Sequence, residues 1–119
     1  MIAVVDDDES VCRAVVRLLQ VAGHTVRGYA SGHEFLKNWL VHRPDCLFLD
    51  LQMPGLSGMD VQSALNQAKA HIPVVIITAN DSAVARQECM RAGAVAYLLK
   101  PLEARVLLDA VRLAVRSLH

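Results

Sequence analysis

The stretch Cys46-Leu-Phe-Leu-Asp50 is a short apolar run that ends in a carboxylate. Its lack of polar alternation is typical of a strand that is buried on both faces. The same pattern predicts further strands at Ile2–Val5, Thr25–Tyr29, Val74–Thr78 and Ala94–Leu99. These five segments are spread over the whole chain, so the sequence between them decides how they connect.

Apolar residues at helical spacing follow each predicted strand. The first helix carries Val11, Val15, Leu18, Leu19 and Ala22, and Gly23 ends it. The capping box Ser31-Gly-His-Glu34 opens the second, whose apolar face is Phe35, Leu36, Trp39 and Leu40 and which Pro44 closes. Ser57-x-x-Asp60 caps the third, Asp81 caps the fourth as far as Ala92 with Gly93 as its stop, and Glu103 opens the fifth, with Val106, Leu107, Ala110, Val111 and Ala114 inward.

Five strands that alternate strictly with five helices predict an α/β fold, a (βα)5 doubly wound parallel sheet with right-handed crossovers. The 119 residues, 54% of them hydrophobic, suffice for one domain over 1–119 and exclude a disordered chain. Twelve basic residues balance twelve acidic ones, which argues against a freestanding nucleic-acid binder. We expect no membrane span and no signal peptide. Cys12, Cys46 and Cys89 form no C-x-x-C pair, which favours a reducing cytoplasmic location.

Charged and hydroxyl residues stand where the predicted strands end. They are Asp6 to Glu9, Asp50, Thr78 and the pair Lys100-Pro101. Ligands of open α/β sheets bind outside the carboxyl ends of the strands, so these groups should converge. Taken singly, the acids have a simpler interpretation: they lie in a solvated turn, and their negative charges are favourable near the N-terminus of the helix that follows.

Taken together, these residues predict a pocket for an anion and a metal. Each close pair of carboxylates costs on the order of 1 kcal/mol or more, which a hard cation such as Mg²⁺ would offset. A lysine after an apolar strand is costly without a partner, and its ammonium suits a phosphate. A carboxylate nucleophile with a cation, a hydroxyl and an ammonium is the equipment for phosphoryl transfer onto an aspartate.

Five motifs resemble those of bacterial response-regulator receiver domains. They are Val5-Asp6-Asp7-Asp8-Glu9, Asp50-Leu-Gln-Met-Pro-Gly55, Ile77-Thr78-Ala79, Gly93-Ala-Val-Ala-Tyr97 and Lys100-Pro101. The Gly93 run and Ser57-Gly58-Met59 resemble the FixJ-like branch in particular. The resemblance implies a flavodoxin-like sheet with strand order 2-1-3-4-5.

The resemblance also implies residue roles. Asp50 would be the phosphoacceptor, and Mg²⁺ (or Mn²⁺) would be held by Asp6, Asp7, Asp50 and the backbone carbonyl of Gln52. Of the acidic pair, Asp7 would be the more direct ligand, although Asp8 and Glu9 extend the run and leave the metal-binding acids open. Lys100 would pair with the phosphoryl group and Thr78 would hydrogen-bond to it. Tyr97 would be the rotamer switch that turns inward, with an edge-of-sheet packing role as its alternative, and the bond before Pro101 would be cis.

The partners implied are a sensor histidine kinase, with its specificity on the first helix around Val11–Val15, and a phosphorylation-dependent second copy. We expect no nucleic-acid contact by this domain, a DNA-binding output domain outside this chain, and no enzymatic activity beyond its own phosphorylation and dephosphorylation. Two rivals are less well supported. Phosphatases of the haloacid-dehalogenase type resemble D-x-D-x-T, whereas Asp50 precedes Leu-Gln-Met-Pro; a phosphate-independent module would lack Asp50, Lys100 or the acidic pair.

Overall fold

A parallel five-stranded sheet forms the centre of the protein, which is described by a computed structural model covering residues 1–117. Its strands are β1 (Ile2–Val5), β2 (Val26–Tyr29), β3 (Cys46–Asp50), β4 (Val74–Thr78) and β5 (Ala96–Leu99). They lie in the order β2-β1-β3-β4-β5, and every neighbouring pair is parallel. The predicted α/β class and strand order are therefore confirmed.

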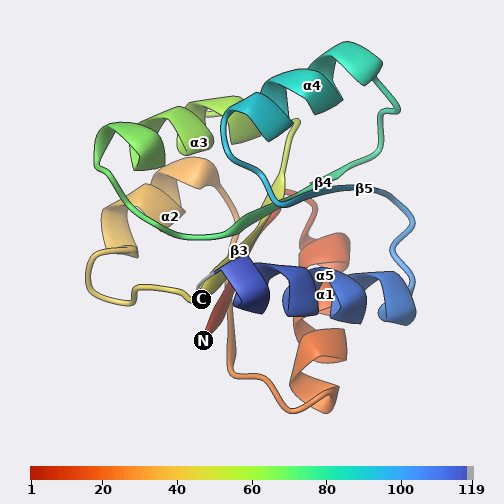
Figure 1. Cartoon of the computed structure of the whole chain (residues 1–119). Coiled ribbons are helices and arrows are strands. Elements are labelled where there is room, and N and C mark those ends of the chain that lie inside the picture. The colour runs from red at the N-terminus through yellow and green to blue at the C-terminus, as the bar shows by residue number, and fades with distance from the viewer. Residues whose placement is uncertain (118–119) are drawn as a thin grey trace.

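Five helices cover the two faces of this sheet (Figure 1). They are α1 (Glu9–Val21), α2 (Gly32–Asn38), α3 (Gly58–Gln67), α4 (Ala83–Arg91) and α5 (Ala104–Ser117). Helices α2, α3 and α4 lie on one side of the sheet, and α1 and α5 lie side by side on the other. No helix in residues 1–117 has the length and apolar character needed to cross a bilayer.

Alternate residues of each strand build two separate cores, because successive side chains point to opposite faces. On the α2–α3–α4 side, Val5, Leu49 and Ile76 pack with Phe35, Val61 and Cys89. On the α1–α5 side, Val4, Phe48 and Ile77 pack with Val15, Leu19, Leu107 and Ala110. The side chains on both faces of β1, β3 and β4 are therefore buried, which is why the sequences of these strands show no polar alternation.

The predictions for where the helices begin and end are partly confirmed. Gly23 and Gly93 follow α1 and α4 with φ angles of 99° and 104°, so both act as the expected stops. The Ser57–Asp60 capping box is present in both directions. Helix α3 is different, since Lys69 takes the left-handed position after it with φ 55°.

Three details of the predicted helices are wrong. Helix α2 ends at Asn38, because the Asn38 carbonyl accepts the N–H groups of both Val41 and His42 and the chain turns there; Leu40 is consequently 74% exposed. Ser82, not Asp81, caps α4 by accepting from the Ala85 N–H. Val106 is 40% exposed because the buried face of α5 is centred on Leu107, Ala110 and Ala114.

Candidate functional site

The carboxylates of Asp6, Asp7 and Asp50 meet at the carboxyl edge of the sheet. Val5 pairs with Leu49 in the sheet, so the next residues of the two strands, Asp6 and Asp50, come side by side. Asp6 and Asp50 are only 1% and 4% exposed, whereas Asp7 faces solvent. One ligand oxygen from each of the three lies within 4.8 Å of the others. Sequence reasoning placed these acids together, and the structure does so.

Asp8 and Glu9 do not belong to this cluster. The Asp8 carboxylate accepts the N–H groups of Ser10 at 3.0 Å and Val11 at 3.2 Å, which makes it the N-cap of α1. Glu9 pairs with Arg13 one turn along the same helix. The Asp8 N–H also donates to Asp6 Oδ1 at 2.9 Å and so orients that buried carboxylate. The acidic run therefore divides into site acids and helix-capping acids, a division that the sequence left open.

Lys100 supplies the positive charge of the site. It follows β5, and its Nζ lies 2.8 Å from Asp6 Oδ2 and 3.5 Å from Asp50 Oδ1. Burial of the ammonium acts to lower its pKa, but the contacts with Asp6 and Asp50 outweigh this and raise the pKa of Lys100 above its ordinary value. The Lys100–Pro101 peptide bond is cis, as the resemblance implies.

The pKa of Asp50 is raised from 3.8 to about 7, first by burial and then by the charge of Asp6. The Lys100 ammonium works in the opposite direction and does not restore the ordinary value. Three converging carboxylates thus share one ammonium. The site therefore carries excess negative charge and would bind a metal cation favourably. The donor set consists of hard oxygen ligands with one member open to solvent, which fits Mg²⁺ or Mn²⁺ with retained waters.

Thr78 and Tyr97 are joined through Asn80. Thr78 is fully buried at the end of β4, and its Oγ1 accepts the Asn80 N–H at 3.2 Å. Tyr97 is 8% exposed, and its hydroxyl donates to the Asn80 carbonyl at 3.2 Å. The Tyr97 ring therefore lies in the inward position, one of the two positions expected of the predicted rotamer switch. Asn80 connects the two predicted switch residues through its backbone.

Two further residues bear on the site. The Gln52 side chain is exposed, which is compatible with a role for its backbone carbonyl alone. Gly58, which entered the sequence analysis only through the resemblance to the FixJ-like branch, lies against the backbone of Asp50: a Cβ at this position would be 2.6 Å from the Asp50 carbonyl oxygen and 2.8 Å from Leu51 Cα. Its signal in the sequence was a glycine just after a serine N-cap, at the start of a helix where glycine is otherwise unfavourable.

Comparison with known proteins agrees with this fold and site. The family model "Response regulator receiver domain" matches residues 2–112. Nodulation protein W of Bradyrhizobium diazoefficiens is 37% identical over 111 residues, covering 93% of this chain and 49% of that protein. The transcriptional regulatory protein FixJ of Azorhizobium caulinodans is 32% identical over 109 residues, covering 92% of this chain and 52% of that one.

Solved structures lead to the same family. The crystal structure of FixJ-N has a TM-score of 0.90 at 32% identity, covering 97% of this chain and 92% of that one. Chemotaxis protein CheY4 of Vibrio cholerae has a TM-score of 0.86 at 29% identity, covering 93% and 94%.

The chain belongs to the receiver domains of response regulators. Such domains are signalling switches of two-component systems, and histidine kinases phosphorylate them. The relatives include transcriptional regulators, and the chain spans about half the length of the curated relatives it matches.

Proposed function

We propose that this domain accepts a phosphoryl group from a sensor histidine kinase on Asp50. The observation that carries the proposal is the convergence of Asp50 with two further carboxylates, an ammonium and a buried threonine at one sheet edge. The Asp50 carboxylate oxygen would bond to phosphorus while the bond from phosphorus to the donor's histidine nitrogen breaks. Water would later cleave the acyl phosphate and restore the carboxylate.

The residues around Asp50 divide the work of this transfer. Asp6, Asp7, Asp50 and the Gln52 carbonyl would hold Mg²⁺ or Mn²⁺, which when bound supplies charge neutralisation and orientation of the phosphoryl oxygens. Lys100 Nζ lies 3.5 Å from Asp50 Oδ1, and its ammonium would form an ion pair with the phosphoryl group on Asp50. Beyond its own phosphorylation and dephosphorylation, the domain would have no enzymatic activity.

The signal would leave the site through the Thr78–Asn80–Tyr97 connection. Thr78 Oγ1 accepts from the Asn80 N–H, so its hydroxyl hydrogen is available to a phosphoryl oxygen. A shift of Thr78 towards the phosphoryl group would leave space beside Tyr97 and so favour the inward ring position, in which its hydroxyl donates to the Asn80 carbonyl. The surface formed by α4, β5 and α5 would then change and control pairing with a second copy.

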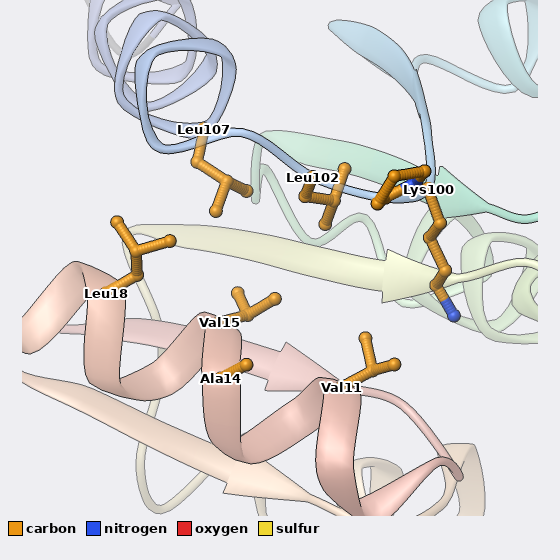
Figure 2. Close-up of a pocket in the computed structure, with 8 residues that line it drawn as sticks. Val11, Ala14, Val15, Leu18, Lys100, Leu102 and Leu107 are labelled. Atoms are coloured by element: carbon orange, nitrogen blue, oxygen red, sulfur yellow. The ribbon is translucent and has the colours of Figure 1, made fainter.

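The kinase would dock on the side of the site where α1 faces α5. A groove of about 240 Å³ runs there, lined by Val11, Ala14, Val15, Leu18, Lys100, Pro101, Leu102 and Leu107. Figure 2 shows the α1 side chains pointing across it towards Leu102 and Leu107, with Lys100 at one end. This apolar face of α1 lies beside the Asp50 site. It would suit a helix of the kinase that carries the phosphohistidine and packs against α1.

We further propose that this domain, 1–119, is the receiver part of a longer cytoplasmic regulator with a DNA-binding output domain. Its support is that relatives called transcriptional regulatory proteins are about twice as long as the matched segment. The receiver itself would contact neither DNA nor a membrane.

The decisive experiment is intact-mass measurement after incubation with acetyl phosphate and Mg²⁺. The wild type is expected to gain one phosphoryl group, and the gain should vanish with EDTA and in Asp50→Asn. An exposed-site control, Asp109→Asn, should behave as wild type. Failure of the folded wild type to gain mass from either acetyl phosphate or a phosphorylated kinase domain would overturn the proposal.

A further inference from the structure

Gln62 is a buried polar side chain that the phosphoacceptor site does not use. Among residues 1–116, the buried polar or charged residues are Asp6, Asp50, Thr78 and Gln62, and the first three belong to the site. Gln62 is 2% exposed and lies on α3, on the opposite side of the sheet from α1 and α5. Because burying an amide is costly unless it is hydrogen-bonded, its partners should show its purpose.

Those partners are at the end of a neighbouring helix. Gln62 Nε2 donates to the Cys89 carbonyl at 3.2 Å, and one turn later Asn66 Nδ2 donates to the Ala92 carbonyl at 2.9 Å. Both carbonyls lie at the C-terminal end of α4, where the last carbonyls lack intrahelical partners. The Cys89 thiol, 3.4 Å from the Met59 sulfur, adds a third contact with α3. We call the Gln62 and Asn66 hydrogen bonds the α3–α4 clamp.

Among the described contacts, the opposite end of α4 makes no side-chain hydrogen bond to another helix, and Ala85 is only partly buried against the core. Cys89, near the C-terminus, is its one buried residue, and Val84 in the first turn is 67% exposed. The first turn is capped locally by Ser82. This end follows Thr78 and Asn80 directly along the chain. Helix α4 is thus held at one end and connected to the switch residues at the other.

The clamp also has a cost that packing does not explain. Gln62 Oε1 is buried without a hydrogen-bond partner, which destabilises the fold. The Cys89 carbonyl already accepts the Ala94 N–H, so an apolar side chain at 62 would leave no unpaired carbonyl. Packing alone would therefore accept methionine at position 62, so what the glutamine adds is its hydrogen bond to the C-terminal end of α4.

We propose that the α3–α4 clamp is a hinge, so that α4 moves at its N-terminal end while its C-terminal end stays fixed. The static half of this inference stands on the contacts alone. The moving half rests on the proposed function, because phosphorylation of Asp50 would displace Thr78 and Asn80. Their displacement would then swing the exposed first turn of α4 and not translate the whole helix.

The static half is tested by amide hydrogen exchange with mass spectrometry on peptides covering 81–87 and 88–95. In the unphosphorylated protein, Gln62→Met is expected to exchange about five-fold faster over 88–95, the effect of one hydrogen bond, and to leave 81–87 unchanged. Asn66→Ala should act in the same direction. Gln67→Met, an exposed glutamine of the same helix, is the matched control and should match wild type. Equal exchange over 88–95 in Gln62→Met and wild type would overturn the clamp.

The moving half uses the same peptides after acetyl phosphate and Mg²⁺, with the adduct verified by intact mass. Wild type should change over 81–87 only, whereas Gln62→Met should change over both peptides. A verified adduct that alters both peptides equally in wild type would refute the hinge. If no adduct forms, the proposed function fails, and the unphosphorylated comparison still decides whether the clamp exists.

Discussion

Replacing Asp50 by asparagine is expected to stabilise the metal-free protein, and more so as pH rises. Asp50 is buried beside Asp6, and its pKa is raised from 3.8 to about 7. Between these two values the folded protein keeps a proton that the unfolded chain releases. A raised carboxyl pKa therefore gives stability that is complete below the unfolded value and is lost as pH rises through the folded value.

The size of the effect follows from the same shift. A displacement of about three pKa units is worth about 4 kcal/mol against the ionised form, and this is reached above pH 7. At pH 5 only the part between the unfolded pKa and the buffer pH has been lost, or about 2 kcal/mol. The advantage of Asp50→Asn over wild type should therefore grow by roughly 2 to 3 kcal/mol between pH 5 and pH 8.

Urea unfolding in EDTA, followed by fluorescence of the single tryptophan, measures this difference. Trp39 is 7% exposed and is packed in the core beneath Arg43, so unfolding changes its surroundings. Adding Mg²⁺ at pH 8 should raise the stability of wild type more than that of the variant, because the ion offsets the charge that the variant lacks. An advantage that does not change between pH 5 and pH 8 would refute this reasoning; Asp109→Asn, on the surface, is the control.

Three other substitutions test local features. Gly58→Ala should destabilise the fold by about 2 kcal/mol or more in urea unfolding, because its Cβ would meet the backbone of Asp50; a change under half of that would contradict the close packing. Lys69→Gly should stabilise by about 1 kcal/mol, since glycine adopts φ 55° without the Cβ penalty, and Lys69→Ala should give no gain. Asp8→Ala should cost about 1 kcal/mol through the lost α1 cap, whereas Asp8→Asn should keep the cap and the Mg²⁺ affinity measured by titration calorimetry; a large loss of affinity in Asp8→Asn would make Asp8 a ligand.

Sequence reasoning predicted most of the fold because the strands are short, apolar and evenly spaced between helices. It also brought Asp6, Asp50, Thr78 and Lys100 together, since parallel strands all end at one edge. It did not separate Asp8 from Asp7, because a carboxylate can cap a helix or bind a metal and only the backbone direction after β1 decides. It missed Gln62, whose hydrogen-bond partner, the Cys89 carbonyl, is 27 residues away in α4.

Helix ends were predicted less well for a related reason. The end of α2 at Asn38 depends on two N–H groups competing for one carbonyl, which no spacing rule reveals. Ser82 and Asp81 are both good caps, and their order in the structure depends on how the chain leaves β4. Such choices are made by tertiary contacts and not by local preference.

The position of Lys100 has a consequence for the way the chain assembles. Its two carboxylate partners are Asp6, which follows β1, and Asp50, the last residue of β3, and a ribosome completes both well before β5 emerges. A nascent chain that stopped short of β5 would hold the acidic edge with no ammonium to balance it, so its early sheet would be weakened at neutral pH. The ammonium of Lys100 therefore joins Asp6 and Asp50 only when the last strand of the sheet has been made. An incomplete chain that lacks β5 carries the carboxylates without this counter-charge.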